Sequence, residues 1–456
     1  MEILTNIIDW VNNMLWGKNI LVFMLIGAAI YTTIRTKGMQ FRLFGDIIGI
    51  LRKNEKSENG VSSLEAFFLG TACRVGAGNI TGVVAAISVG GPGSIFWMWA
   101  VALLGAATSF VESTLAVLYR SKVGYDKYIG GTPWIIEKRL KKRWLGVIYA
   151  LASLVCYMGV IQVMSNSVTE SINNAYHIEI KHIAIGLSII VALILFAKNK
   201  KDSIILALNK IVPLMAILYL MVVIYVLITN FSTIPAMIAN VFAHAFGVKE
   251  MFGGGIGIVV MQGVRRGLFS NEAGSGDSNY AAAVASVDEP AKQGMVQALG
   301  VFMDTLVVCS ATAFIVLLAK EDVTAGKTGM AMFQAAIQNH IGWAGIPFSV
   351  VVLFFFALST ILGVSYYGKS AISFMSHFRV FNYIYYVIVV IMIYVGGIEQ
   401  NFFVWSLADF GLGIMTVINI ICILPIAGEA IEELKKYEKK LKSEKEERKM
   451  CVRGAK

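Results

Sequence analysis

Two glycine-rich segments lie inside long apolar stretches, where freed backbone groups could bind an ion and a small polar molecule. The first runs from Gly70 to Gly82 and contains Arg74-Val75-Gly76-Ala77-Gly78-Asn79. The second opens with Gly253-Gly254-Gly255-Ile256-Gly257 and continues to Gly274. At membrane depth, an interrupted helix persists only where protein buries the freed backbone or where that backbone lines a wet cavity. Two interruptions in corresponding places therefore predict one shared binding site.

The first interruption offers groups for ligands of both signs. Free amides at a half-helix amino terminus suit a carboxylate, and free carbonyls at a half-helix carboxyl terminus suit a small cation. Asn79 can donate and accept hydrogen bonds. Small residues are also common where membrane helices pack closely, but two clusters in matching places favour a site. We expect Gly253, Gly254, Gly255 and Gly257 to supply unwound backbone that faces the first interruption.

Three polar residues lie in otherwise apolar stretches. Ser359 and Thr360 are adjacent, and each hydroxyl could bond to the carbonyl one turn back or could coordinate sodium, since hard cations take oxygen ligands. Gln162 could contact a ligand, although a hydrogen bond to a neighbouring helix is slightly favoured. The residues alone leave these alternatives open.

Charged side chains inside a membrane are costly and suggest function. Arg74 lies within the first interruption, Glu272 follows the second glycine cluster, and Glu112, Asp304 and Asp409 lie in predicted spans. Arg74 needs a carboxylate partner, for which Glu272 and Asp304 are both candidates. A structural or gating role ranks first for this group, because an arginine beside a sodium site would repel the ion.

Composition places these residues in a membrane. The chain has 456 residues, of which 57% are hydrophobic and 15% charged, whereas a soluble domain has about 25% charged residues. A span needs about 20 apolar residues. The candidate spans are 19–35, 62–89, 94–119, 144–168, 182–198, 204–229, 252–285, 293–319, 346–368, 382–398 and 403–427. Amphipathic stretches near 39–52 and 233–246 should lie at the interface.

The basic residues predict the orientation. Most of the 39 lysines and arginines fall in alternate loops and in the carboxyl-terminal tail, which the positive-inside rule assigns to the cytoplasm. The amino terminus is then outside, and the net charge of +10 does not indicate nucleic acid. Five lysines remain outside: Lys18, Lys181, Lys249, Lys320 and Lys327.

Eleven spans divide into one extra span and two groups of five, each beginning with its interrupted span. Because five is odd, the two groups have opposite orientations, which is the inverted-repeat architecture. The predicted fold is an all-α polytopic membrane protein with a 5+5 inverted repeat. The expected parts are 1–61 (amino terminus, extra span and amphipathic helix), 62–229 (first repeat), 230–251 (interfacial helix), 252–427 (second repeat) and 428–456 (charged cytoplasmic tail).

Enzyme and metal motifs are missing from the sequence. It contains no GxxxxGK[ST], HExxH or GxSxG, and its five cysteines are scattered, so neither a disulfide framework nor a zinc site is expected. We therefore predict no cofactor, no catalytic residue and no ATP-driven pump in this chain.

Four stretches resemble the alanine/glycine:cation symporter family, also called sodium:alanine symporters. They are Arg74-Val-Gly-Ala-Gly-Asn-Ile80, Gly90-Gly-Pro-Gly-Ser-Ile-Phe-Trp-Met-Trp99, Arg266-Gly-Leu-Phe-Ser-Asn-Glu-Ala-Gly274 and Lys292-Gln-Gly294 through Gly300-Val-Phe-Met-Asp-Thr305. The likeness extends over nearly the whole chain and is weakest in the tail. It implies eleven spans in a leucine-transporter-type fold, located in the plasma membrane, and sodium-driven uptake of small amino acids.

The resemblance also implies roles for single residues. Gly76, Ala77, Gly78 and Asn79 would meet the amino acid, as would Gly253 to Gly257, Gln162 and Thr360. Sodium would be held by the carbonyls of Ala72, Val75 and Phe356 and by the hydroxyls of Ser359 and Thr360.

Two departures from the family pattern concern the substrate. Family members commonly carry threonine where this chain has Ala77, and tryptophan where it has Val364. The smaller Val364 would leave room for a side chain larger than alanine, such as serine or glutamine. Other readings of the chain are a proton-coupled transporter or exchanger, a channel or receptor, and a membrane-embedded enzyme. The oligomeric state is not predicted.

Overall fold

A computed structural model describes residues 2–53, 60–124, 127–197, 203–247, 255–399 and 401–454. These residues are almost entirely helical, apart from one antiparallel hairpin of β1 (Ser121–Gly124) and β2 (Lys127–Ile129). The helices are α1 (Glu2–Asn12), α2 (Ile20–Arg35), α3 (Met39–Arg42), α4 (Phe44–Lys53), α5 (Ser63–Arg74), α6 (Gly78–Gly90), α7 (Gly93–Leu118), α8 (Thr132–Leu140), α9 (Arg143–Tyr176), α10 (Ile180–Leu195), α11 (Ser203–Thr229), α12 (Ile234–Ala245), α13 (Gly255–Asn271), α14 (Ser278–Ala283), α15 (Pro290–Val301), α16 (Ser310–Leu317), α17 (Glu321–Thr324), α18 (Gly329–Ile341), α19 (Gly345–Met375), α20 (Arg379–Ile398), α21 (Asn401–Ile423) and α22 (Ala427–Gly454). Two π-helical segments, η1 (Asn13–Gly17) and η2 (Phe302–Cys309), and two 3-10 turns, η3 (Gly342–Ala344) and η4 (Leu424–Ile426), complete the chain order.

Eight helical segments of the described residues are long and apolar enough to cross a bilayer, or nine when a bent pair counts as one span. The bent pair is Thr5–Gly17 with Ile20–Arg35, at 45°. The eight segments are Ser63–Gly90, Gly93–Leu118, Arg143–Tyr176, Ser203–Thr229, Pro290–Leu317, Gly329–Met375, Arg379–Ile398 and Phe403–Glu444. The chain is thus a multi-pass helical membrane protein, while the number of eleven spans stays a prediction. The two amphipathic stretches form α3, α4 and α12.

The first interruption lies where the first glycine cluster predicts it. α5 begins at a capping box of Ser62 and Glu65, which satisfies the free amides at its start, and ends at Arg74. Before α6 begins, the backbone amide of Gly76 donates a hydrogen bond to the side-chain oxygen of Asn79 at 3.0 Å. The Asn79 side chain therefore satisfies a backbone donor that the interruption frees.

The second interruption separates α13 from α14 and covers residues 272–277. Its backbone enters the left-handed region at Glu272 (φ 58°), Gly274 (φ 101°) and Gly276 (φ 84°). Glycine adopts such angles without strain, and a helix cannot continue through them. The turn is therefore specified by Gly274-Ser275-Gly276.

For Gly255 and Gly257 the expected unwound backbone was wrong, although residues 272–277 lie within the predicted interrupted span 252–285. Gly255 and Gly257 lie in the first turns of α13, and a Cβ added to Gly257 would meet open space. Gly253 and Gly254 lie outside the described residues. A glycine cluster at the start of a helix needs no special backbone angle, whereas the later Gly-Ser-Gly turn requires positive φ.

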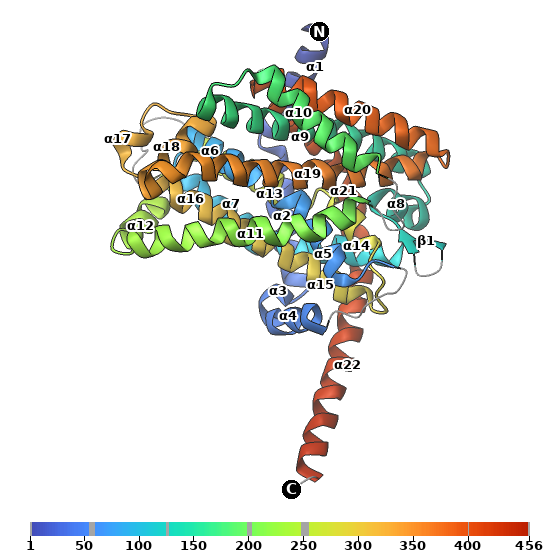
Figure 1. Ribbon diagram of the computed structural model, residues 1–456. Helices are drawn as coiled ribbons and strands as arrows, with labels where there is room; N and C mark the ends of the chain where they lie inside the picture. Colours follow the sequence, from blue (N-terminus) through green and yellow to red (C-terminus); the bar gives the residue numbers. More distant parts are fainter. Residues whose placement is uncertain are drawn as a thin grey trace.

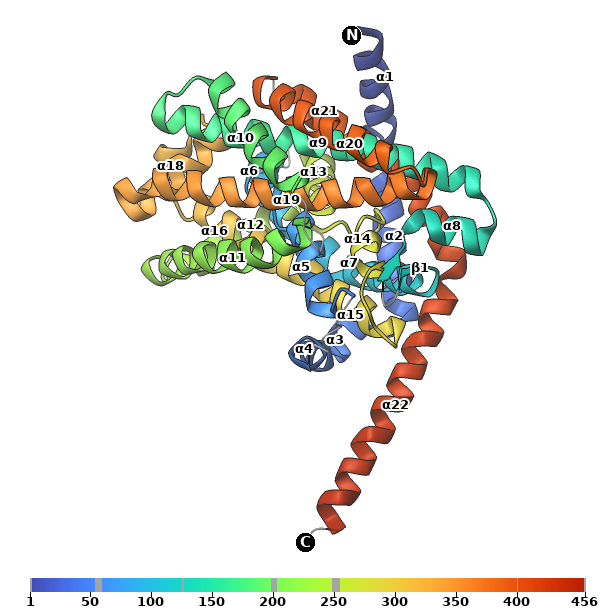
Figure 2. The same ribbon diagram turned by 45° about the vertical axis from the view of Figure 1, so that its right-hand side comes forward.

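The two interruptions face each other in the middle of the bundle. α13 packs against α6 and α7, and α14 packs against α5. α9 forms the other wall of this region, because it packs against α19, α20 and α21. Figures 1 and 2 both show α5 and α14 side by side near the centre, with α19 crossing close to them.

The charged tail forms one long helix. α22 leaves the bundle on the side away from α1 and ends at the carboxyl terminus (Figures 1 and 2). Its first turns bury Ala427, Ala430 and Leu434 against the cluster that contains α3, α4 and α15. Arg42 pairs with Glu438 at 2.7 Å, so the start of the tail is fixed to the bundle.

Candidate functional site

Thr360 on α19 lies so close to the first interruption that only glycine fits opposite it. A Cβ added to Gly76 would lie 1.8 Å from Thr360 Oγ1 and 2.9 Å from Thr360 Cβ. The Thr360 hydroxyl donates a hydrogen bond to the carbonyl oxygen of Ala72 at 3.1 Å. Ala72, Gly76 and Thr360 are all buried. A hydroxyl oxygen and a carbonyl of the interrupted helix therefore converge at the end of α5.

The neighbouring hydroxyl behaves differently. Ser359 donates a hydrogen bond to the carbonyl oxygen of Phe356, within α19, at 2.9 Å, and its hydroxyl lies 3.4 Å from Met215 Sδ on α11. Ser359 thus makes the bond to its own helix that was one of the two uses left open by the sequence. Thr360 instead bonds to the interrupted helix, which is neither of those two uses. Val75 is buried beside Ala72.

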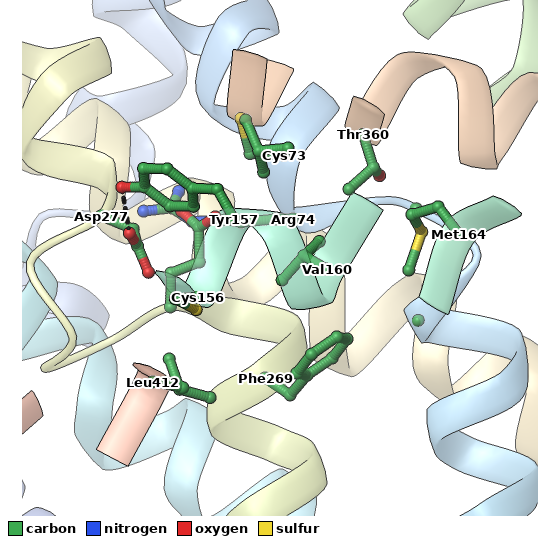
Figure 3. A pocket seen from close by; sticks show the side chains of 14 residues that line it. Cys73, Arg74, Cys156, Tyr157, Val160, Met164, Phe269, Asp277, Thr360 and Leu412 are labelled. Carbon is green, nitrogen blue, oxygen red and sulfur yellow. Dashed lines mark hydrogen bonds and ion pairs between the residues drawn. The ribbon is translucent and has the colours of Figure 1, made fainter. Parts of the chain in front are cut away.

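A small cavity lies between the two interruptions, α9 and α19 (Figure 3). Its volume of about 30 Å³ is room for at most two or three water molecules, since each needs at least about 10–15 Å³. In Figure 3, Thr360 and Met164 lie at one end, and Asp277, Tyr157 and Arg74 lie at the other. The lining residues from the sequence prediction are Gly76, Gly78, Thr360, Val364, Arg74 and Glu272.

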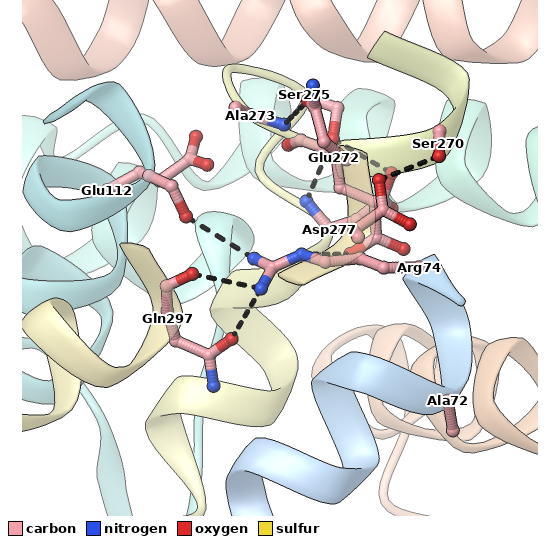
Figure 4. Close-up of polar contacts among 12 residues, drawn as sticks. Ala72, Arg74, Glu112, Ser270, Glu272, Ala273, Ser275, Asp277 and Gln297 are labelled. Carbon is pink, nitrogen blue, oxygen red and sulfur yellow. Dashed lines mark hydrogen bonds and ion pairs between the residues drawn. The ribbon is translucent and has the colours of Figure 1, made fainter. Parts of the chain in front are cut away.

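Arg74 joins the two interruptions. Its Nη1 donates hydrogen bonds to the backbone oxygen and to Oε1 of Gln297, at 3.0 and 3.1 Å, and its Nη2 donates one to Ser109 Oγ at 3.3 Å (Figure 4). Its Nε lies 3.7 Å from Glu272 Oε2. Of the two carboxylates that the sequence proposed, Glu272 is the one in ion-pair range.

Asp304 instead binds three neutral donors. Its carboxylate accepts hydrogen bonds from Asn79 Nδ2 at 2.5 Å, Ser270 Oγ at 2.7 Å and Thr305 Oγ1 at 2.9 Å. It lies in the π-helical η2, and π-helical turns are frequent at functional sites. Asp304 therefore connects α6 and α13 to η2, and it holds the side chain of Asn79, which does not line the cavity.

Some predicted residues do not meet the others. Gln162 lies on α9 and faces α20, where its Nε2 is 3.0 Å from Met392 Sδ. It does not line the cavity. Gly255 and Gly257 do not line the cavity either, and Ala77 is buried at the start of α6 without reaching it.

Comparison with known proteins identifies the family. The profile of the sodium:alanine symporter family matches residues 1–451. The chain belongs to this family. It is therefore a membrane transporter and not an enzyme.

Relatives and solved structures agree with membership of the sodium:alanine symporter family. The chain is 41% identical to the amino-acid carrier protein AlsT of Bacillus subtilis, over 92% of this chain and 90% of that protein. It is 37% identical to the probable sodium/glutamine symporter GlnT of the same organism, over 98% and 93%. A manganese transporter of Eremococcus coleocola has a similar fold, with a TM-score of 0.54 and 12% identity over 81% of this chain and 78% of that one.

In this member of the sodium:alanine symporter family, Asp277 is a residue that the sequence analysis missed. It lines the cavity, and its carboxylate accepts hydrogen bonds from Tyr157 Oη at 2.6 Å and from Ser275 Oγ at 2.9 Å. The available signal was Gly274-Ser275-Gly276-Asp277, in which small residues precede a polar one, as they do in Gly76-Ala77-Gly78-Asn79.

Glu112 has a structural place beside the second interruption. It accepts hydrogen bonds from the Gly274 amide at 3.2 Å and from Asn419 Nδ2 at 2.8 Å.

Phe269 is a second cavity residue that the sequence analysis missed. Its ring lies 2.8 Å from where a Cβ on Gly78 would be, so it fixes one wall of the cavity.

Proposed function

We propose that this chain is a sodium-coupled symporter that imports small neutral amino acids. The observation that carries the proposal is the approach of Thr360 Oγ1 to the Ala72 carbonyl oxygen at 3.1 Å. Both atoms are oxygens, which sodium prefers as a hard cation. The proposed sodium ligands are the carbonyls of Ala72, Val75 and Phe356 and the hydroxyls of Ser359 and Thr360.

The amino acid would bind where this cavity lies, next to the ion, in a state in which the cavity is wider than the about 30 Å³ it has here. Gly76, Gly78 and Thr360 line the cavity and form the proposed substrate region. Ala77 and Asn79 do not line it and would shape this region by positioning the start of α6. Freed backbone amides suit a carboxylate. The second interruption, residues 272–277, takes the place proposed from the sequence for Gly255 and Gly257. Gln162 would act indirectly, through the packing of α9 on α20.

The range of substrates would include side chains larger than that of alanine. Val364 lines the cavity, where the family commonly has tryptophan, and Ala77 replaces a common threonine. We propose that serine and glutamine are accepted alongside alanine and glycine.

Coupling would depend on both ligands stabilising one closed state. Sodium and amino acid must then raise each other's affinity by the same factor. We propose eleven spans in a 5+5 inverted repeat in the plasma membrane, with the amino terminus outside and the tail in the cytoplasm. Arg74 and Glu272 would hold the two interruptions together during closure.

The test is uptake of labelled alanine into proteoliposomes with and without an inward sodium gradient, at fixed pH. Sodium-stimulated uptake that is lost in the double variant Ser359→Ala/Thr360→Ala supports the proposal. Uptake that is independent of sodium contradicts it and points to proton coupling or exchange.

A further inference from the structure

The centre of the protein holds more buried carboxylates than buried bases. Glu112, Glu272, Asp277 and Asp304 are 0%, 6%, 4% and 0% exposed. Within the described part of the chain, Arg74 is the one basic side chain paired with any of them. The other two buried or half-buried arginines of this region, Arg265 and Arg266, pair with Asp409 on α21. Uncompensated charge at this depth is strongly unfavourable, so each of these carboxyl groups needs a proton, neutral hydrogen-bond donors or a cation.

Three of these carboxylates are satisfied by neutral donors, and the fourth is not. Asp304 accepts three hydrogen bonds, and Glu112 and Asp277 accept two each. Glu272 Oε2, by contrast, is buried and lacks a hydrogen-bond partner. A buried polar atom without a partner calls for an explanation, such as an ion or water that completes its shell.

Arg74 does not complete that shell. Its Nη atoms bond to Gln297 and Ser109, which are neutral. Its Nε also lacks a hydrogen-bond partner, and the separation of 3.7 Å from Glu272 Oε2 is too long for a hydrogen bond.

Glu272 and Asp277 face one end of the cavity together. They are the first and last residues of the second interruption, and both line the cavity with Arg74. Figure 3 shows Asp277 and Arg74 at the end away from Thr360, and Figure 4 shows Glu272 and Asp277 on one side of Arg74. The carboxyl ends of α5 and α13 also lie here, at Arg74 and Asn271, and a helix carboxyl terminus favours positive charge.

We propose that Glu272 and Asp277 form a second cation site, which carries one proton or one sodium ion in each transport cycle. The two carboxylates outnumber the single positive charge of Arg74, so the arginine weakens the binding of a cation here without preventing it. This site is separate from the sodium site proposed at Ala72 and Thr360, and the inference rests on the proposed symport function. Besides Arg74 on α5, the ionisable groups that face the pair are Cys73 on α5, Glu112 on α7, Tyr149, Cys156 and Tyr157 on α9, Tyr280 on α14, Asp304 on η2 and Tyr367 on α19.

The test is the number of charges moved per alanine in proteoliposomes of the full-length protein. Alanine is a zwitterion, so the charges come from the coupled cations. At zero net flux, a membrane potential of about 60 mV is balanced by an about tenfold alanine gradient if one charge moves, and by an about hundredfold gradient if two move. We expect two charges in the wild type and one in Glu272→Gln or in Asp277→Asn.

The identity of the second cation follows from the same vesicles with the potential clamped to zero. If the site takes a proton, an about tenfold proton gradient is balanced by an about tenfold alanine gradient. If the site takes sodium, the proton gradient has no effect, and an about tenfold sodium gradient is balanced by an about hundredfold alanine gradient.

Glu112→Gln is the matched control, because Glu112 is an equally buried carboxylate near Arg74 but does not line the cavity. Its charge ratio should stay at two, whatever its transport rate. If the wild type moves one charge per alanine, the second site is overturned and the proposed function remains intact. This result needs only the wild type, so it holds even if neither Glu272→Gln nor Asp277→Asn folds. Two charges in a transporting Glu272→Gln also overturn it. Absence of sodium-dependent uptake in the wild type overturns the proposed function, and this inference with it.

Discussion

The hydroxyl of Thr360 and the carbonyl oxygen of Ala72 lie 3.1 Å apart, although the two residues belong to helices far apart in the sequence. This contact connects α19 to the last turn of α5. A cation between these oxygens would replace the hydroxyl hydrogen as the bridge. Binding of the ion would thus change how firmly α5 is held to α19.

Replacing Thr360 by alanine should weaken sodium binding. The variant removes one of the oxygens that converge at the end of α5, and an interaction with a charged group is worth about 1.5–3 kcal/mol. We expect the sodium concentration for half-maximal alanine uptake to rise by about tenfold to hundredfold. Ser359→Ala should have a smaller effect, since the Ser359 hydroxyl is bonded to its own helix.

Ser365→Ala is the control for this prediction. Ser365 is a buried hydroxyl on the same helix, and it donates to the Ile361 carbonyl at 2.6 Å. Its sodium dependence should match the wild type. An unchanged sodium requirement in Thr360→Ala would remove Thr360 from the ion site.

The variant Gly76→Ala should prevent the close packing of α5 against α19. The new Cβ would lie 1.8 Å from Thr360 Oγ1, so α5 and α19 would have to separate. Overpacking of this kind costs about 1–3 kcal/mol, and alanine uptake should fall by about tenfold or more. Gly82→Ala on α6 is the matched control, because its nearest contacts would be 3.8 and 3.9 Å. Equal uptake in both variants would contradict the close approach.

The sequence identified the first interruption correctly, and it predicted the interrupted span 252–285 that contains the second, but it wrongly expected unwound backbone at Gly255 and Gly257. Gly76 and Gly78 lie inside an apolar stretch, so a break in the helix was the simplest reading. Gly253 to Gly257 form a denser cluster than Gly274 and Gly276, yet of the described members Gly255 and Gly257 lie in a helix, whereas Gly274 and Gly276 have positive φ. Glycine content indicates where a turn is possible, while the backbone angles are set by tertiary packing.

The hydrogen-bond and ion-pair partners of side chains were harder to predict from the sequence than the interruptions of the helices. The sequence reduced the partner of Arg74 to Glu272 or Asp304, and the choice depended on η2, which turns Asp304 toward Asn79 and Ser270. Gln162 could not be placed either. Its contact with Met392 depends on how α9 packs against α20, and sequence spacing within one helix does not determine that packing.

Enlarging Val364 should narrow the range of substrates. Val364 lines the cavity, so the indole of Val364→Trp would fill space that a long side chain needs. Competition by glutamine against labelled alanine should then require an about tenfold higher concentration, since loss of one or two methylene-sized contacts is worth about 1–3 kcal/mol. Uptake of alanine itself should persist. If no amino acid larger than alanine competes in the wild type, the role proposed for Val364 fails.

The single variant Arg74→Gln should destabilise the protein more than the double variant Arg74→Gln/Glu272→Gln. Arg74→Gln leaves the buried Glu272 carboxylate without its ion-pair partner, and breaking a buried pair from one side costs about 3–5 kcal/mol. Arg74→Gln/Glu272→Gln removes both charges, so part of that loss should be recovered. Thermal unfolding of the purified protein in detergent measures the difference, and Glu438→Gln at the surface gives the baseline for an exposed pair. If the double variant loses as much stability as Arg74→Gln and Glu272→Gln lose in sum, Arg74 and Glu272 are not energetically coupled. The two interruptions are then held together by other contacts.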